Sequence, residues 1–409
     1  MSLRRQLPVS SPIDGRSLVR ALGKASTFAI ARPHERAAAH SAVASMLAST
    51  FGASQVTLTD SGTSALVVAL RLAVPPGGTV AFPGYACIDL AAAARFAGVR
   101  VRLYDLDPVT MSADLTSLKA ALARGAQAVL AVHLYGYAAD LPAMRAVSRE
   151  HGAVLIEDAA QGAGGIMQGR PLGSFGDLSI LSFGRGKGTT GGNGGALLSF
   201  TPEWDERARR VSGTMRPPSA GWGDLAAAAA QWAVGRPSLY ALPSSVPGLR
   251  LGEMVFHPAH EPGSLSVVAA TLVRQALAMN DDEVAARRRN ATALADAILW
   301  DGSLVPIRPV PGCTPGFLRL PIRDRAGRGA RAALGVMRGY PRTLLEQPEL
   351  RPCLMTSEPA TPGALDLRES LMTLPTHSMM TTADIRAVCT WLREAAPRTT
   401  LAAVLDGTA

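Results

Sequence analysis

The sequence is poor in aromatic residues, which make up 5% of its 409 residues, and it contains only four cysteines. The cysteines are scattered and none forms a Cys-x-x-Cys pair: Cys87, Cys313, Cys353 and Cys389. Disulfide-stapled domains and zinc sites both have regular cysteine spacings, so neither class is indicated. We therefore expect small apolar thiols, most of them buried, and no metal centre.

Long hydrophobic runs are also lacking. No stretch approaches the roughly 18 apolar residues that a membrane span needs. Arg4 and Arg5 stand near the N-terminus, but no apolar segment of the secretory type follows them. We expect a cytoplasmic protein that does not contact the membrane.

Lysine is scarce as well, since Lys24, Lys119 and Lys187 are the only ones. The net charge of +9 therefore rests on arginines, which are spread along the chain with small clusters at 207–210 and 287–289. No basic arm is interleaved with aromatic residues, so the pattern argues against nucleic-acid binding. The positive surplus favours an anionic small substrate instead.

The first half of the chain alternates short apolar, β-branched runs with helical patterns, which indicates an α/β domain. We expect a mostly parallel sheet of seven strands with helices on both faces. The predicted strands are Val56–Asp60, Thr79–Pro83, Val99–Asp107, Ala128–Tyr135, Ala153–Asp158, Leu178–Phe183 and Gly195–Phe200. The predicted helices between them are Thr63–Ala73, Ile88–Ala97, Asp114–Ala123 and Leu141–His151.

The second half of the chain has a different pattern. We assign 1–262 to the large domain, including an irregular connector at 217–262 that is rich in proline and glycine. A long helix at 263–300, broken near 280–282, would lead into a smaller α+β domain at 301–409.

Two acids and an amide follow the apolar run Val154–Ile156, namely Glu157, Asp158 and Gln161. Ligands of such sheets collect at the carboxyl ends of the strands. A carboxylate in that place can pair with a protonated ring nitrogen, as pyridoxal phosphate (PLP) requires. The alternative is that Asp158 only caps the next turn.

A lysine lies about thirty residues later in a glycine-rich segment that extends from Ser182 to Gly195. The glycines flanking Lys187 would let a planar ligand approach closely, and a deprotonated lysine can form a Schiff base. Ser182 leads out of a predicted strand and could donate to a phosphate. An ordinary flexible loop remains the alternative, and the nucleotide-type Gly-x-x-x-x-Gly-Lys-Ser/Thr spacing is absent.

The third segment is Asp60-Ser-Gly-Thr-Ser-Ala-Leu66, between a strand and a helix. Free backbone amides at a helix N-terminus bind anions, so Gly62, Thr63 and Ser64 are candidates for holding a phosphate. A plain helix cap without a ligand would look the same.

Together these segments resemble the DegT/DnrJ/EryC1/StrS family of PLP-dependent sugar aminotransferases, which have the fold of PLP transferases of type I. The resemblance rests on the order Ser-Gly-Thr-Ser-Ala-Leu, Glu-Asp-Ala-Ala-Gln, Gly-Ser-Phe-Gly-Asp and Ser-Phe-x-x-x-Lys. Similar patterns occur in Pro83–Cys87, Val132–Gly136 and Leu374–His377. The resemblance extends from about residue 30 to 395.

The resemblance implies that Lys187 forms the Schiff base and moves the proton, while Asp158 pairs with the pyridine nitrogen. Gln161 would lie against the ring or its phenolic oxygen, and Gly62, Thr63 and Ser182 would hold the phosphate. A homodimer with shared active sites is implied too. An amino acid, glutamate or glutamine, would supply the amino group to a keto sugar, commonly nucleotide-linked.

The chain also departs from the family pattern. The ring-stacking aromatic residue is replaced by Cys87, so Tyr85 would stack on the ring instead or Cys87 would pack beneath it. A frequent histidine is replaced by Ala163. Members that dehydrate sugars lack the lysine, so Lys187 favours transamination. A cyclitol acceptor, another PLP reaction on the same fold and a catalytically idle binding protein remain alternatives.

Overall fold

The computed structural model of the protein describes residues 5–241, 255–299 and 301–394. Three parts of the predicted elements lie outside these residues: the middle of the connector at 242–254, the end of the long helix at Trp300, and 395–409.

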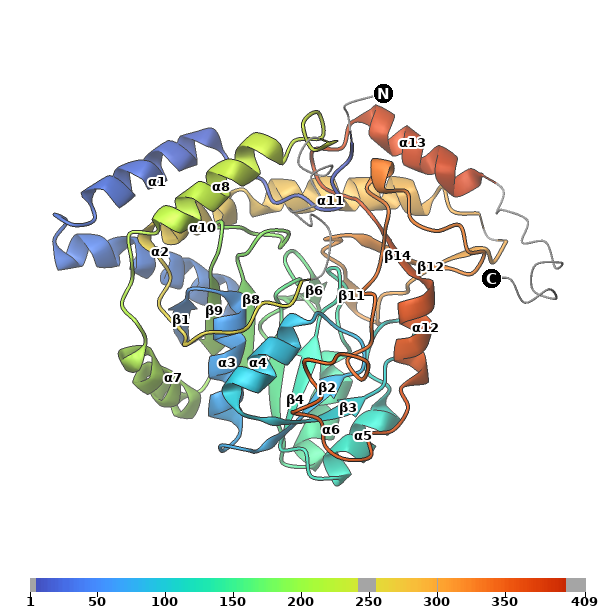
Figure 1. The fold of residues 1–409 in the computed structure, drawn as a ribbon, viewed down its shortest axis with the longest axis horizontal. Coiled ribbons are helices and arrows are strands. Elements are labelled where there is room, and N and C mark those ends of the chain that lie inside the picture. Colours follow the sequence, from blue (N-terminus) through green and yellow to red (C-terminus); the bar gives the residue numbers. More distant parts are fainter. Residues whose placement is uncertain (1–4, 242–254, 300, 395–409) are drawn as a thin grey trace.

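A seven-stranded sheet forms the centre of the molecule, in the order β1-β9-β8-β5-β4-β2-β3 (Figure 1). Only β9 runs antiparallel to its neighbours. The strands are β1 (Gln55–Thr59), β2 (Thr79–Pro83), β3 (Arg100–Tyr104), β4 (Ala128–Val132), β5 (Val154–Asp158), β8 (Leu178–Ser182) and β9 (Gly195–Ser199). The predicted α/β class and its seven strands are confirmed.

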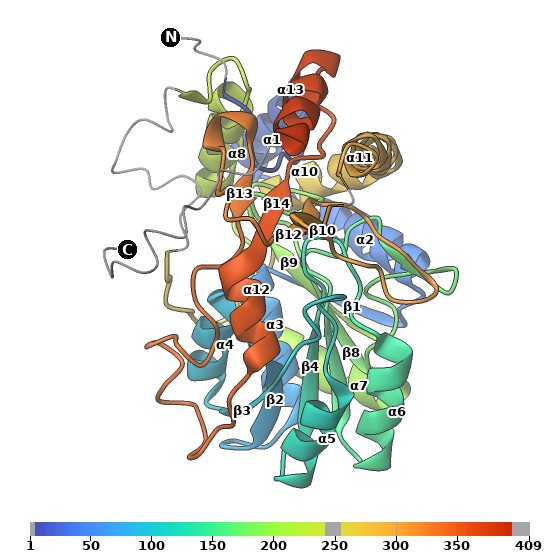
Figure 2. The ribbon, with the colours of Figure 1, turned by 90° about the vertical axis from the view of Figure 1, so that its right-hand side faces the viewer.

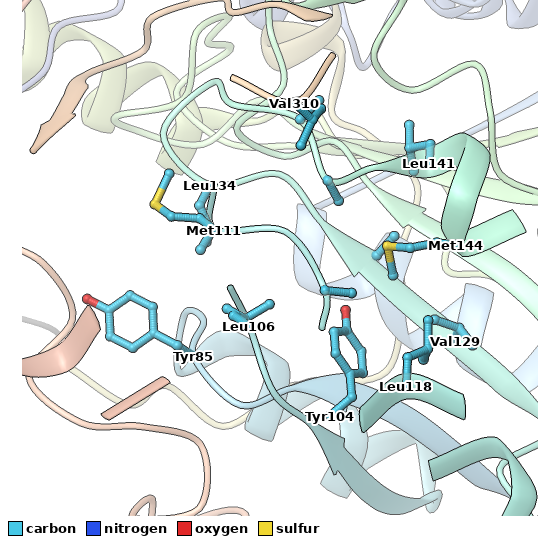
Figure 3. Close-up of a cluster of buried hydrophobic side chains, with 14 of the residues drawn as sticks. Tyr85, Tyr104, Leu106, Met111, Leu118, Val129, Leu134, Leu141, Met144 and Val310 are labelled. Carbon is cyan, nitrogen blue, oxygen red and sulfur yellow. The ribbon is translucent and has the colours of Figure 1, made fainter. Parts of the chain in front are cut away.

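Helices cover both faces of this sheet because alternate strand residues point to opposite sides. In β4, Ala128 and Leu130 pack in one apolar cluster, while Val129 and Ala131 pack in the other. The first cluster includes α3 (Gly62–Ala73) and α4 (Asp89–Ala97). The second includes α5 (Leu115–Ala123) and α6 (Leu141–Glu150), and Figure 3 shows Leu118, Leu141 and Met144 of these helices near Val129.

Further helices lie across the top and along the left side of the molecule as drawn in Figure 1. They are α1 (Gly15–Thr27), α2 (Pro33–Phe51), α7 (Pro202–Thr214), α8 (Trp222–Val234), α10 (Val267–Ala278) and α11 (Asn280–Ala295). Small residues let α1, α8 and α10 approach one another, among them Ala21, Ala228 and Val268. The predicted long helix is interrupted at Met279, within a residue of the expected break.

The C-terminal part builds a separate antiparallel sheet in the order β10-β12-β14-β13. Its strands are β10 (Leu304–Pro306), β12 (Leu320–Asp324), β13 (Met337–Arg338) and β14 (Leu371–Leu374), with η2 (Ala332–Leu334), α12 (Pro362–Ser370) and α13 (Thr382–Arg393). A small sheet joins β11 (Cys313–Thr314) to β6 (Ile166–Met167) and β7 (Arg170–Pro171).

Contacts between distant segments fasten the C-terminal part to the rest. Figure 2 shows α12 beside the main sheet and α13 near the N-terminus. The Asp105 carboxylate accepts the amide hydrogens of Gly363 and Ala364 at 2.9 and 2.8 Å, which caps α12. The Gln6 amide donates to the Ala333 carbonyl at 3.0 Å. Across the described residues, no helix is both long and apolar enough to cross a membrane.

Candidate active site

The predicted site residues gather where strands of the main sheet end. β5 ends at Asp158 and β8 at Ser182, and these neighbouring strands run parallel, so their carboxyl ends lie at the same edge. The loop after β8 carries Lys187. Burial raises the pKa values of Asp158 and Cys87, and the positive charge of Lys187 opposes both rises.

Asp158 is a buried carboxylate with 5% of its surface exposed. Its Oδ1 atom accepts the Ala160 amide hydrogen at 2.9 Å. Burial raises the pKa of Asp158, and the Ala160 amide, Lys187 and His133 oppose that rise. A cationic ligand beside the carboxylate would favour its ionised form further.

Glu157 organises the other side of the same strand end and is fully buried. It accepts hydrogen bonds from five groups: the ring of His133, the amides of Gly173, Phe175 and Gly176, and the hydroxyl of Ser179. Burial opposes ionisation of Glu157, but the His133 and amide hydrogen bonds outweigh it and lower its pKa. This carboxylate thereby fixes the loop between β7 and β8 against β5.

The N-terminus of α3 lies beside Ser182. The Ser61 side chain caps the helix by accepting the Ser64 amide hydrogen at 3.0 Å, and the first intrahelical bond runs from Ala65 to Ser61. The Gly62 and Thr63 amides precede that bond and are therefore available to a ligand. A Cβ atom on Gly62 would come within 2.6 Å of the Ser182 Oγ atom.

The Ser64 hydroxyl has a different role from the one expected. It donates to Asp60 Oδ1 at 2.5 Å, and the residue is 2% exposed. Both its hydroxyl and its amide are therefore engaged within the helix cap. Gly62, Thr63 and Ser182 remain as the groups that could hold an anion.

The loop after β8 that carries Lys187 is held from two sides by residues that were not predicted from the sequence. Ser11 donates from its hydroxyl to the Lys187 carbonyl oxygen, and the fully buried Arg287 packs against Gly188. A Cβ atom on Gly188 would overlap that of Ala163. The close approach of these two segments gives a physical reason for a small side chain at 163.

Tyr85 packs against the C-terminal part of the chain, and its expected contact with the cofactor stays a prediction. Its exposed fraction is 0%, and its hydroxyl contacts the backbone of Tyr340. Figure 3 shows Tyr85 at the margin of the apolar cluster to which it belongs, with its hydroxyl toward the C-terminal ribbon. Cys87 is only partly buried and lies within the field of Lys187, while burial raises its pKa to about 12.

Gln161 is held at both ends of its amide. Its Oε1 atom accepts the Tyr135 amide hydrogen at 2.9 Å, and its Nε2 atom donates to the Tyr340 hydroxyl at 2.7 Å. Sequence reasoning missed Tyr340, because it is 179 residues from Gln161 and belongs to no recognisable motif.

A cavity of about 340 Å³ adjoins Ser182 and Ala160. It is lined mainly by apolar side chains from α2, α10 and α11, among them Leu47, Phe51, Leu277 and Val284. Asp158, Gln161 and Lys187 do not line it. The cavity therefore borders the anion-binding end of the candidate site rather than the lysine.

Residues 39–222, which include every site residue predicted from the sequence, match the sequence model of the DegT/DnrJ/EryC1/StrS aminotransferase family. The chain is thus similar to this family over that range. The segments between Asp60 and Lys187 that carried the resemblance lie within the matched range, whereas Leu374–His377 lies outside it.

Individual relatives match over part of their length. An L-glutamine:2-deoxy-scyllo-inosose aminotransferase from Streptoalloteichus tenebrarius is 34% identical over 262 residues, which cover 62% of this chain and 55% of the relative. A UDP-N-acetyl-3-dehydro-alpha-D-glucosamine 3-aminotransferase from Acidithiobacillus ferrooxidans is 35% identical over 151 residues, covering 36% and 41%. The chain spans about half the length of these curated relatives.

The fold is also that of solved aminotransferases. The structure of the aminotransferase TlmJ from Streptoalloteichus hindustanus superposes with a TM-score of 0.72 at 24% identity, covering 99% of this chain and 100% of that one. This agreement confirms the predicted fold of PLP transferases of type I.

The residues at the sheet edge fit a planar, phosphorylated, cationic cofactor. Asp158 is a buried carboxylate with a raised pKa that a ring cation would stabilise. The α3 amides and Ser182 form a close recess that a Cβ on Gly62 would fill. The half-buried Lys187 follows β8 in the chain, and its charge favours the ionised form of Asp158.

Proposed function

We propose that this protein is a PLP-dependent aminotransferase that moves an amino group from an amino acid to a keto sugar. The observation that carries the proposal is the topology of the main sheet. The buried Asp158 ends β5 beside the parallel strand β8, and β8 ends at Ser182 and leads into the loop of Lys187, while the start of α3 lies against Ser182. The match of residues 39–222 to the model of the DegT/DnrJ/EryC1/StrS aminotransferase family supports it.

PLP, when bound, withdraws electrons from the carbon that carries the amino group. Lys187 would bind the cofactor as a Schiff base and afterwards carry the proton between substrate atoms. The Asp158 carboxylate would pair with the ring nitrogen. The Gly62 and Thr63 amides and the Ser182 hydroxyl would hold the phosphate, with Cys87 beneath the ring.

The amino donor is proposed to be glutamate or glutamine, and the acceptor a keto sugar, either nucleotide-linked or free. A cyclitol ketone is the second candidate acceptor, because the relative from Streptoalloteichus tenebrarius is named for glutamine and 2-deoxy-scyllo-inosose. The relative from Acidithiobacillus ferrooxidans is named for a nucleotide sugar instead. Both acceptors are polyhydroxylated ketones, so they would make the same demands on the catalytic residues.

We further propose a cytoplasmic homodimer with shared active sites, divided into residues 1–262, a linking helix at 263–300, and 301–409. The antiparallel sheet of the C-terminal part begins with β10 at Leu304, which supports the proposed boundary at residue 301. Sedimentation of the PLP-loaded protein would test the dimer.

The test of the activity follows the visible absorption of the PLP-loaded protein. Glutamate or glutamine should bleach the band, and a suitable ketone should restore it and yield an amine. Nucleotide-linked keto sugars and a keto-cyclitol are compared as acceptors. A band that no amino acid bleaches would contradict amino transfer and favour another PLP reaction or an idle binding protein.

A further inference from the structure

Tyr340 connects the C-terminal part of the chain with the loop that carries Asp158 and Gln161. In the sequence it lies shortly after β13, between β12 and β14, and it is 8% exposed. Its hydroxyl accepts a hydrogen bond from Gln161 Nε2 at 2.7 Å. Gln161 follows Asp158 by three residues, so this bond reaches the loop at the end of β5.

The backbone of Tyr340 is itself fixed by Tyr85. The Tyr340 amide donates to the Tyr85 hydroxyl at 2.5 Å, and that hydroxyl lies 3.3 Å from the Tyr340 carbonyl oxygen, to which it donates. A Cβ atom on Gly339 would overlap the Tyr85 hydroxyl. Glycine is therefore required at 339 for this close approach.

The ring of Tyr340 is fixed by Tyr135. The two rings stack with centroids 5.7 Å apart and an angle of 29° between their planes. The Tyr135 backbone amide donates to Gln161 Oε1 at 2.9 Å. The stacked tyrosines thus hold opposite ends of the Gln161 amide, which has one Nε2 hydrogen left for a ligand.

The two stacked tyrosines interact electrostatically with neighbouring groups of the site. Cys87 adds to the rise in the pKa of both Tyr135 and Tyr340, and Lys187 opposes the rise in the pKa of Cys87. Arg319 also faces both rings. Burial raises the pKa of Tyr340 well above its ordinary value, so its phenol stays neutral at working pH. A neutral, immobile phenol suits a hydrogen-bonding role rather than that of a base.

We propose that Tyr340 is a positioning residue that orients the Gln161 amide toward the ligand beside Lys187. The site then depends on the docking of residues 335–340 against Tyr85 and Tyr135. This inference rests on the proposed function, since it assigns Gln161 a contact with bound PLP.

The test compares wild-type protein with Tyr340→Phe and with Tyr104→Phe as matched control. Tyr104 is equally buried, and its hydroxyl donates to the Leu130 carbonyl at 2.7 Å, away from Gln161. Tyr340→Phe should weaken PLP binding about tenfold and move the pH midpoint of the visible band by about half a unit or more. Tyr104→Phe should leave both quantities unchanged.

A double variant separates positioning from general damage. If Tyr340 acts through Gln161, then Gln161→Ala combined with Tyr340→Phe should bind PLP no worse than Gln161→Ala alone. Wild-type PLP affinity and an unmoved pH midpoint in Tyr340→Phe would overturn the inference while leaving the proposed function standing. Equal losses in Tyr340→Phe and Tyr104→Phe would also overturn it. A wild-type protein that does not bind PLP would instead overturn the proposed function, and the inference with it.

Discussion

Gly62 and Ser182 come from different strand ends and lie so close that a Cβ atom on Gly62 would be 2.6 Å from both the Cβ and Oγ atoms of Ser182. Real Cβ atoms do not approach neighbours this closely, so glycine is required at 62 by its surroundings. The contact aligns the Ser182 hydroxyl with the amides at the start of α3.

Replacement of Gly62 by alanine should therefore damage the proposed phosphate site. The added methyl group must push Ser182 away from the α3 amides, which should raise the Kd for PLP about tenfold or more and lower stability by about 1–3 kcal/mol. Fluorescence titration and thermal melting measure the two effects. The control is Gly23→Ala, because Gly23 is an exposed helical position with no atom within 4 Å of the added methyl group. Unchanged PLP affinity in Gly62→Ala would contradict this account of the recess.

Replacement of Asp158 by asparagine should lower the activity of the protein without lowering its stability. Asparagine keeps the oxygen that accepts the Ala160 amide but loses the charge proposed to pair with the ring nitrogen. The reaction with the amino donor should slow by about 100-fold or more. Because burial disfavours the Asp158 carboxylate, the cofactor-free variant should melt at the same temperature or higher. Full activity in the variant would refute the assigned role.

The pH dependence of stability should report on His377, which is 1% exposed and hydrogen-bonds through Nε2 to the Leu7 carbonyl at 3.0 Å. Burial lowers the pKa of His377 from 6.5 to about 4. The folded protein thus favours the neutral ring. The neutral ring therefore contributes about 3 kcal/mol to the free energy of unfolding. This contribution is complete above pH 6.5 and is lost as the pH falls toward 4.

Urea unfolding between these pH values measures that loss. His377→Gln should flatten the acid-side slope, whereas His151→Gln, which changes an exposed histidine, should leave it as in the wild type. A slope unaffected by His377→Gln would place the acid-sensitive group elsewhere.

Local sequence patterns predict most of the central fold. The seven strands of the main sheet carry periodic apolar residues bounded by turn residues, and each was found within a few positions. The starts of α3 and α5 lie at Ser61 and Asp114, whose side chains cap the helices, and serine and aspartate are residue types that favour this position. The helices α1, α2 and α7 were not predicted. Helix α2 shows no one-sided apolar periodicity, and its pattern alone therefore does not distinguish it.

The site could be predicted only as far as its residues lie in short motifs at strand ends. Asp158, Ser182 and Lys187 follow strands, so topology brings them together. The hydrogen bond between Gln161 and Tyr340 links segments that are 179 residues apart, and no local pattern encodes it. The burial of Tyr85 against Tyr340 depends on the same long-range packing, which no local pattern encodes either.

The most direct test of the central claim is to mix the protein with PLP, reduce it with borohydride and map the modified peptide. The chain has only three lysines, so Lys24 and Lys119 serve as internal controls. We predict that the pyridoxyl-phosphate adduct forms on the peptide containing Lys187 and disappears in Lys187→Ala. An adduct spread equally over the three lysines, or none at all, would contradict the account.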